Sequence, residues 1–412
     1  MQGAAGAYPA GDLMSTAPGH MQDSKPRPQM PPWPFYAADE IDAVAAVLRS
    51  GRVNQWTGEL VRAFEKACEK AFGQPHALAL ANGSLALELA LKAFGIGSGD
   101  EVIVTPRSFV ASASCADLVG ALPVFADIDI DSQGLTAQTI AARITPRTKA
   151  IIPVHLNGWP CDMAPIMELA EKHGLKVIED CAQSHGAMIG GRPAGSFGHA
   201  AAFSFCQDKI MTTGGEGGMV LFAEEAPARI AWSFRDHGKN PDKVARKDHP
   251  AGYRWLHDSV GTNWRMTEMQ AAIGLAQLEK LPEWRAAREK NAERMAAALE
   301  KSPLAVVSRP PKGVLHAYYR LAFRLDRERL ADGWDRDRVM AALNGAGVPC
   351  TVGTCPELYR EALYAGRSHA PCPQAAELGR LSLNLLVHPT LDDAFLLHCE
   401  SVIGDIFRQA AR

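Results

Sequence analysis

The sequence lacks paired cysteines and long apolar runs. Its nine cysteines include no C-x-x-C pair and no repeated zinc spacing, which gives no basis for a zinc module or a disulfide framework. No run of 18 apolar residues occurs, and the first lysine is Lys25, so a membrane helix and the basic start of a secretory signal are both missing. We therefore expect a cytoplasmic protein with no membrane partner.

The chain also lacks a strong charge of either sign. Its 43 Lys and Arg residues against 46 Asp and Glu residues leave a net charge of -3, so no general basic surface is available to hold a nucleic acid. With 47% hydrophobic and 22% charged residues, the composition is that of a globular protein. A length of 412 residues allows one large domain and a smaller one.

Residues 1–33 differ from the rest of the chain. They contain repeated prolines and glycines and little periodic hydrophobicity, so they offer too little apolar surface to offset the entropy lost on ordering. We predict a flexible N-terminal tail over this range.

From residue 34 onward, apolar runs alternate with helical patterns. Continuous runs separated by helices predict an α/β fold whose central sheet is mostly parallel and covered by helices on both faces. We assign 34–260 to this large domain and 261–412 to a smaller C-terminal α+β domain. Predicted strands are 76–81, 101–105, 122–126, 150–154, 176–178 and 319–325; predicted helices are 40–48, 60–72, 84–94, 163–173, 267–281, 284–300 and 336–346.

Ligands in open parallel sheets bind beyond the carboxyl ends of the strands, so polar residues that follow apolar runs are the first candidates. Asn82-Gly83-Ser84 turns a strand into a helix, and the N–H groups of that helix start suit a phosphate. Taken alone, the segment is more commonly an ordinary helix cap. In Glu179-Asp180-Cys181-Ala182-Gln183, Asp180 closes an apolar strand and could hold a protonated ring nitrogen, or it could cap the following turn.

Lys209 follows the apolar run 202–205 and precedes the glycine-rich loop 212–218. A lysine beside buried strands loses its proton easily and can act as a Schiff-base amine, although a surface lysine is the commoner case. The loop matches neither G-x-x-x-x-G-K-[ST] nor G-x-G-x-x-G, so it does not predict ATP or dinucleotide binding. Phe109, just past another strand end, could stack on a planar group or pack in the core. A phosphate turn, a carboxylate, an aromatic ring and an amine together are what a pyridoxal 5'-phosphate site requires.

The sequence resembles the DegT/DnrJ/EryC1/StrS sugar aminotransferases, which have the aspartate-aminotransferase fold (fold type I) and use pyridoxal 5'-phosphate. The resemblance runs from about residue 34 to residue 407. Its clearest motifs are Asn82-Gly83-Ser84-Leu85-Ala86-Leu87, Pro123-Val124-Phe125-Ala126-Asp127-Ile128-Asp129, Glu179-Asp180-Cys181-Ala182-Gln183, the block 204–218, and Gly261-Thr262-Asn263-Trp264-Arg265-Met266.

This resemblance implies roles for individual residues. It implies that Lys209 carries the cofactor and moves protons, and that Asp180 pairs with the pyridine nitrogen. It also implies that Gln183 contacts the ring oxygen and Phe109 stacks on the ring. The residues that it implies for the phosphate are Gly83, Ser84, Ser204 and, from a second subunit of a homodimer, Asn263. The implied reaction moves an amino group from L-glutamate to a keto-sugar, most simply a nucleotide-linked one, in amino-sugar and cell-surface polysaccharide biosynthesis.

The sequence departs from the family pattern at two places. Cys206-Gln207-Asp208 stands where many members have His or Tyr and then Pro-Thr or Gly-Asn, and Tyr318-Tyr319-Arg320 stands where many have an aromatic-His pair. The acceptor could instead be a cyclitol ketone or another keto acid, and a non-catalytic sensor that binds the cofactor is a further alternative. Dehydratases of this fold replace the lysine by histidine, so Lys209 favours amino transfer.

Three histidines near the predicted site, at 155, 185 and 237, fit structural roles better than metal ligation, because no H-E-x-x-H motif or Cys/His cluster accompanies them. The basic stretch 235–247 predicts a solvated loop, some of which could reach a nucleotide diphosphate.

Overall fold

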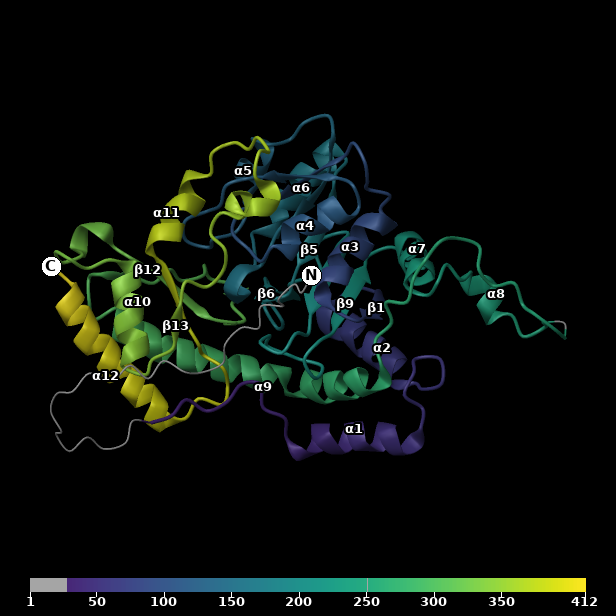
Figure 1. Ribbon diagram of the computed structural model, residues 1–412, viewed down its shortest axis with the longest axis horizontal. Coiled ribbons are helices and arrows are strands. Elements are labelled where there is room, and N and C mark those ends of the chain that lie inside the picture. Colours follow the sequence, from purple (N-terminus) through teal and green to yellow (C-terminus); the bar gives the residue numbers. More distant parts are fainter. Residues whose placement is uncertain (1–27, 250) are drawn as a thin grey trace, which may run out of the picture.

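The computed structural model describes residues 28–249 and 251–412, which form a large seven-stranded sheet, a smaller four-stranded sheet and a short three-stranded sheet (Figure 1). The large sheet has seven strands in the order β1-β9-β8-β5-β4-β2-β3. Their bounds are β1 His76–Leu80, β2 Glu101–Val104, β3 Leu122–Phe125, β4 Thr148–Ile152, β5 Lys176–Asp180, β8 Ala200–Ser204 and β9 Gly218–Phe222.

Four neighbouring strand pairs of this sheet are parallel, and β9 runs antiparallel to both β1 and β8. The predicted mostly parallel sheet is therefore confirmed. Since β8 and β9 are antiparallel neighbours, the chain reverses between them, and the loop 205–217 stays at the edge where β5 and β8 end. Lys209 lies in this loop.

Helices cover both faces of the large sheet (Figure 1). One face packs against α3, α4 and α7, and the other against α2, α6 and the first half of α9. The helices of this domain are α2 Leu60–Phe72, α3 Gly83–Ala93, α4 Ala111–Leu118, α5 Ala137–Ala141, α6 Met163–His173, α7 Glu225–Arg235 and α8 Pro241–Ala245. The observed bounds of α2 and α6 coincide with the predicted ones.

The smaller sheet has four antiparallel strands in the order β10-β12-β14-β13. They are β10 Ala305–Val306, β12 Leu321–Leu325, β13 Cys350–Thr351 and β14 Ser382–Leu385, and the accompanying helices are α10 Arg336–Gly345, α11 Pro373–Leu381 and α12 Asp393–Ala410. A third, three-stranded sheet joins β6 Met188–Ile189 and β7 Arg192–Pro193 with β11 Val314–Leu315. The short 3-10 segments are η1 Leu156–Gly158, η2 Arg327–Arg329, η3 Leu358–Arg360 and η4 Ala362–Tyr364.

One helix, α9 Glu268–Leu299, connects the two regions. The sequence predicted two helices separated at Pro282, and this prediction is wrong, because the helix continues through the proline. Proline removes one helical hydrogen bond. Leu281 is buried against the large domain and Met295 against the small one, so packing on both sides of Pro282 outweighs that loss. Within the described residues, no helix is both long and apolar enough to cross a bilayer.

The N-terminal segment reaches the lysine loop. Residues 1–27 of the predicted tail lie outside the described residues, whereas Trp33 is part of the folded structure. Its indole N–H donates to the carbonyl oxygen of Lys209 at 3.1 Å, and its ring packs against Trp284 and His388. From there the chain enters α1 Ala38–Ser50, which lies beside α9 (Figure 1).

The start of α2 is capped by a residue from far along the chain. Glu59, at the N-cap position, makes no side-chain cap bond. The buried carboxylate of Glu268 accepts instead from the backbone N–H groups of Leu60 at 2.7 Å and Val61 at 3.1 Å. A Cβ atom on Gly58 would lie 2.1 Å from a Glu268 carboxylate oxygen, so only glycine permits this approach. The contact fixes α9 against α2.

We predict that Glu268→Ala destabilises the protein by about 2–3 kcal/mol, because it leaves two buried N–H groups without an acceptor. Chemical denaturation followed by circular dichroism measures the change. Glu59→Ala is the matched control and should stay within about 0.5 kcal/mol of the wild type. Equal losses in both variants would contradict the assignment of the cap to Glu268.

Candidate active site

Seven of the eight predicted site residues line one cavity of about 570 Å³ at the carboxyl ends of the large sheet's strands. We refer to it as the strand-end cavity. The seven are Gly83, Ser84, Phe109, Asp180, Gln183, Ser204 and Lys209. They come from four separate segments of the chain, which the fold brings together at one place.

The first wall of the strand-end cavity is the start of α3. Asn82 caps the helix by accepting from the N–H of Leu85 at 3.0 Å, which confirms the cap interpretation. The N–H groups at 83 and 84 have no acceptor within the helix, because they precede its first hydrogen-bonded turn. A Cβ atom on Gly83 would lie 2.6 Å from the Cβ of Ser204, so a side chain there would fill the gap between helix and strand. Free N–H groups beside the Ser204 hydroxyl form a cradle suited to a phosphate.

Asp180 ends β5 and is 4% exposed. Its Oδ2 accepts from the Ser112 hydroxyl at 2.7 Å, and its Oδ1 accepts from the N–H of Ala182 at 3.1 Å. Burial raises the pKa of Asp180, and these two donors and the nearby charge of Lys209 only partly oppose the rise. The negative charge of Asp180 is therefore only partly compensated, and a protonated ring nitrogen in the cavity would stabilise it further.

The neighbouring carboxylate, Glu179, has the opposite character. It accepts from the backbone N–H groups of residues 195, 197 and 198 and lies 2.9 Å from Nε2 of His155. The backbone N–H of Cys161 donates to Nδ1 of His155 at 3.1 Å, so the neutral ring carries its proton on Nε2 and donates it to Glu179. Cys181 lies within 4.8 Å of both groups, and the three could in principle hold a metal ion. The ligand atoms of Glu179 and His155, however, are already hydrogen-bonded to each other and to backbone N–H groups. This cluster is structural.

Gln183 is fixed by the turn η1. Its side-chain oxygen accepts from the backbone N–H of Asn157 at 2.7 Å, which leaves its NH2 group to donate into the cavity. Asn157 holds a left-handed conformation, with φ 57°, to make this contact. The same residue accepts from the N–H of Tyr319 at 2.9 Å through its carbonyl oxygen.

The amine of Lys209 has two polar partners. Its Nζ lies 3.1 Å from Oδ1 of Asp208 and 3.5 Å from the hydroxyl of Tyr319. Burial lowers the pKa of Lys209, but Tyr319 and Asp208 outweigh burial and the net pKa is raised. The sequence argument that a lysine here loses its proton easily is therefore wrong for the free amine, because it counted burial and not the adjacent carboxylate.

The remaining two predicted residues lie at the periphery. Phe109 lines the strand-end cavity but is 65% exposed, so it is not the packed core residue that the sequence also allowed. Asn263 does not line the cavity and is exposed; its side chain accepts from the N–H of Arg265. Among the described residues, Asn263 makes no hydrogen bond to the other seven predicted site residues.

Two other residues noted in the sequence, His185 and Arg235, are buried. His185 is buried among phenylalanines, neither ring nitrogen has a hydrogen-bond partner in the described part of the chain, and burial lowers its pKa to about 3. It is therefore a neutral core residue. The solvated-loop prediction for 235–247 is wrong at Arg235, which is buried and pairs with Glu65, with Nη1 also donating to the Ala79 carbonyl at 2.9 Å.

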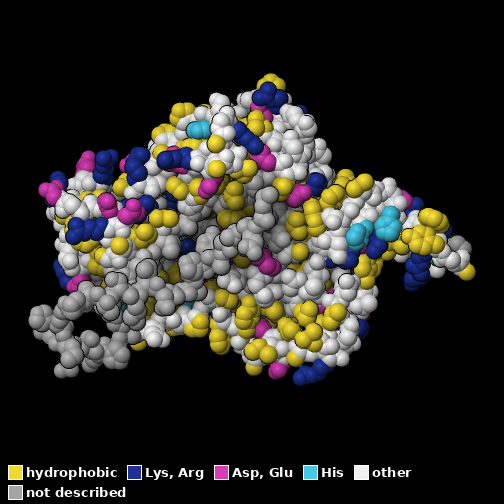
Figure 2. Space-filling model, in the orientation of Figure 1, with side chains coloured by type: hydrophobic (Ala, Val, Ile, Leu, Met, Phe, Trp, Pro, Cys, Tyr) yellow, Lys and Arg dark blue, Asp and Glu magenta, His cyan; other side chains and the backbone are white. Residues whose placement is uncertain are grey.

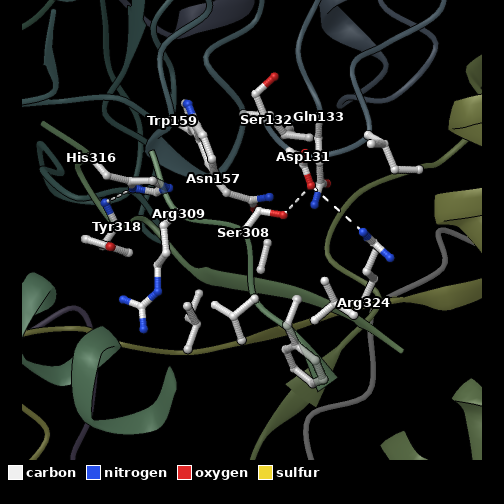
Figure 3. A pocket seen from close by; sticks show the side chains of 17 residues that line it. Asp131, Ser132, Gln133, Asn157, Trp159, Ser308, Arg309, His316, Tyr318 and Arg324 are labelled. Atoms are coloured by element: carbon white, nitrogen blue, oxygen red, sulfur yellow. Dashed lines mark hydrogen bonds and ion pairs between the residues drawn. The ribbon is translucent and has the colours of Figure 1, made fainter. Parts of the chain in front are cut away.

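A second hollow lies between the two sheets, and its lining includes none of the eight predicted residues (Figure 3). Asp131, from the large domain, accepts from the Ser308 hydroxyl at 2.7 Å and lies 4.0 Å from Arg324. Beside them His316 stacks on Tyr318, with ring centroids 4.1 Å apart. These contacts join the domains across the hollow and leave the strand-end cavity as the candidate active site.

Four residues of the candidate site were missed as functional residues in the sequence. Ser112 binds Asp180, Asn157 binds Gln183, Tyr319 contacts Lys209, and Trp33 binds the Lys209 carbonyl. Only Tyr319 carried a signal, since it lies at a departure from the family pattern. The other three are ordinary helix or loop residues in the sequence.

Comparisons with known proteins agree with this geometry. Residues 35–403 match the profile of the DegT/DnrJ/EryC1/StrS aminotransferase family. The crystal structure of an aminotransferase from Psychrobacter cryohalolentis is 47% identical, superposes with a TM-score of 0.91, and covers 92% of this chain and 99% of its own.

Two curated relatives are similar over most of their length. The UDP-N-acetyl-3-dehydro-α-D-glucosamine 3-aminotransferase of Acidithiobacillus ferrooxidans is 37% identical over 84% of this chain and 88% of its own. The GDP-perosamine synthase of Caulobacter vibrioides is 42% identical over 71% of this chain and 75% of its own. The resemblance and the fold type I architecture inferred from the sequence are thus confirmed, and the chain belongs to the DegT/DnrJ/EryC1/StrS aminotransferase family.

Proposed function

We propose that this aminotransferase uses pyridoxal 5'-phosphate to move an amino group from L-glutamate to a nucleotide-linked keto-sugar. One observation carries the proposal: Asp180, a buried carboxylate whose charge is only partly compensated, lines the same cavity as the amine of Lys209. The N-terminus of α3 lines this cavity as well. A flat cationic ring with a phosphate fits this combination of donors and charges. When bound, the cofactor supplies an electron sink for the carbon that loses or gains a proton.

Each residue of the strand-end cavity has a defined part in this proposal. The helix start at Gly83 and Ser84, with the Ser204 hydroxyl, holds the phosphate. Asp180 faces the ring nitrogen and keeps it protonated, and the Gln183 amide donates to the ring oxygen. These contacts orient the ring so that Nζ of Lys209 takes a proton from the α-carbon of the donor and returns one to the acceptor carbon.

Phe109 is placed to cover one face of the ring. Its side chain projects at the mouth of the strand-end cavity, where a planar ligand would bury part of its exposed surface. Offset stacking of aromatic rings is worth about 0.5–1.5 kcal/mol beyond the burial of area.

The substrate class rests on the relatives. One is named for amino transfer at C3 of a UDP-linked keto-sugar and another for the synthesis of GDP-perosamine. A third, the spore coat polysaccharide biosynthesis protein SpsC of Bacillus subtilis, is 33% identical over 92% of this chain. These names favour a nucleotide-linked keto-sugar and a role in polysaccharide biosynthesis. A non-catalytic sensor would need neither Lys209 nor Asp180, and this chain has both.

We further propose that the working unit is a homodimer with shared active sites. An arm made of residues 239–249 and 251–260, which includes α8, projects from the body of the large domain (Figure 1). Three large apolar side chains of this arm are exposed, Tyr253 at 71%, Trp255 at 76% and Val260 at 87%. Figure 2 shows apolar side chains gathered toward the end of the arm. Exposed apolar groups on a projecting arm are typical of an interface. In this arrangement Asn263, at the base of the arm, reaches the phosphate cradle of the second copy.

We expect Lys209 to form the covalent link to the cofactor. Borohydride reduction of the yellow protein, followed by peptide mapping, should place the pyridoxyl group on Lys209. Lys209→Ala protein treated in the same way is the control and should carry no label. A label on another lysine, or a wild-type protein that cannot be made to bind the cofactor, would rule out this assignment.

Asp180→Asn should retain the cofactor through the phosphate contacts but lose at least a hundredfold in the rate of the glutamate half-reaction, or about 2.8 kcal/mol of transition-state stabilisation. The neutral amide no longer keeps the ring nitrogen protonated. Rapid-mixing absorbance with L-glutamate measures the rate. Asp131→Asn, in the hollow between the sheets, is the matched control and should react at the wild-type rate. Near-normal turnover in Asp180→Asn would show that this residue only caps its turn.

Subunit complementation tests the shared site. Lys209→Ala and Asn263→Ala dimers should each be impaired, whereas a mixed dimer has both defects in one site and leaves the other intact. Exchange should therefore restore up to about half the activity of a normal dimer per mixed dimer, as counting sites across a two-fold interface requires. Lys209→Ala mixed with Asp180→Asn is the control, because each site then retains one defect. If exchange is verified by mass and the first pair gains no more than the control, the sites are not shared.

A further inference from the structure

The two departures from the family pattern meet in space. Asp208 and Tyr319 are 111 residues apart in the chain, and the Tyr319 hydroxyl donates a short hydrogen bond to Oδ2 of Asp208. Both groups contact Nζ of Lys209. The sequence is thus unusual at the two positions that surround the reactive amine.

Asp208 is oriented from two sides. Its Oδ1 faces Lys209, and its Oδ2 accepts from Tyr319 and lies 3.8 Å from Nη2 of Arg320. The side chain is 44% exposed, so without these partners it would be free to turn into solvent. Burial raises the pKa of Asp208, but Lys209, Tyr319 and Arg320 outweigh burial and the net pKa is lowered, so the carboxylate is charged at neutral pH.

The segment that supplies Tyr319 and Arg320 is itself fixed. The Asn157 carbonyl accepts from the N–H groups of both residues, at 2.9 Å and 3.4 Å. Nη1 of Arg320 donates to the Thr351 hydroxyl at 3.2 Å, and its Nη2 donates to the Tyr319 hydroxyl at 3.3 Å. Because Asn157 also binds Gln183, the same turn anchors the ring-oxygen side of the strand-end cavity and the partners of Asp208.

Other charged or titratable groups face Lys209, but none of them pairs with its amine. Asp180, from β5, is hydrogen-bonded to Ser112 and Ala182. Besides Asp208 and Tyr319, the charged or titratable groups near the amine in the described part of the chain are Asp180, His185, Cys206, Glu216 and Arg320. Arg288 acts on Tyr319 and His185. Glu216 lines the same cavity but is not hydrogen-bonded to Lys209. Its removal therefore measures the effect of a nearby carboxylate that does not contact the amine.

We propose that Asp208 is a positioning residue that stabilises the protonated form of Lys209, and that Tyr319 and Arg320 hold its carboxylate in place. The proposal rests on the proposed function only for its consequence in catalysis. A lysine that binds its proton more firmly stays protonated, and so available as the acid, over a wider pH range, and it needs a higher pH to become the neutral base that takes a proton from the donor.

The amine of Lys209 can be titrated in the full-length, cofactor-free protein by trace labelling with acetic anhydride across a pH series, read by mass spectrometry of the Lys209 peptide. Asp208→Asn removes an opposite charge in direct contact, so the pKa of Lys209 should fall by about one unit. Tyr319→Phe should lower it by less, because the carboxylate remains but is free to turn away. In the Tyr319→Phe background, Asp208→Asn should cause a smaller shift than in the wild type.

Glu216→Gln is the matched control, since it removes one negative charge from the same cavity without touching the amine. An Asp208→Asn shift no larger than the control shift, or a rise in the pKa of Lys209, would overturn the proposal. A rise in Tyr319→Phe would overturn the part assigned to Tyr319. Circular dichroism of each variant checks that it is folded, and the exposed, nearly isosteric Asp208→Asn change is the least disruptive of them.

The loaded enzyme gives a second readout. The pH at which the visible absorbance of the lysine-bound cofactor changes should shift downward in Asp208→Asn and not in Glu216→Gln. The acid limb of the kcat profile should move to lower pH in the same variant, whereas a merely structural role would lower kcat at every pH. If no coloured protein forms, the proposed function fails while the labelling result still decides the role of Asp208. If colour forms and the pKa values are unchanged, only this inference fails.

Discussion

The buried carboxylate of Asp180 is the constraint on which the site depends. It ends the central strand β5, where burial disfavours its charge and only Ser112 and one backbone N–H compensate. Its neighbour Glu179 points to the other side of the strand and is fully satisfied by His155 and three backbone N–H groups. Two adjacent carboxylates thus have two roles: Glu179 stabilises the loop behind the strand, and Asp180 is available to a cation in the cavity.

The strand order places the remaining groups around that carboxylate. Since β8 lies next to β5 and is followed by the antiparallel β9, the reversal between them keeps Lys209 at the same edge of the sheet. The start of α3 approaches Ser204 at the end of β8 so closely that only glycine fits at position 83. From outside the sheet, Trp33 binds the lysine loop and the turn at Asn157 binds Gln183. Each group is held by backbone geometry rather than by a flexible side chain alone.

Much of this arrangement could be predicted from the sequence, because apolar runs and helix caps are local signals. Five of the seven strands of the large sheet, the bounds of α2 and α6, and the gathering of seven site residues at one edge followed from them. Strands β8 and β9 were not among the predicted ones. Local signals failed at Pro282, where packing on both sides keeps α9 continuous, and at Lys209, where Tyr319 and Asp208 together reverse the effect of burial on the pKa. The Asp208–Tyr319 pair could not be predicted, because nothing in either segment indicates the other. The roles of the eight site residues and the domain boundary at residue 260 stay predictions.

The amino-acceptor half-reaction tests the central claim most directly. Enzyme converted to the amine form with L-glutamate would be mixed with a panel of nucleotide-linked 3-keto and 4-keto sugars, with a cyclitol ketone and a keto acid as comparison acceptors. The account predicts that at least one nucleotide-linked keto-sugar restores the visible absorbance of the lysine-bound cofactor in a single turnover and yields the corresponding amino-sugar. Restoration by the cyclitol ketone or the keto acid, with none by any nucleotide-linked sugar, would contradict it.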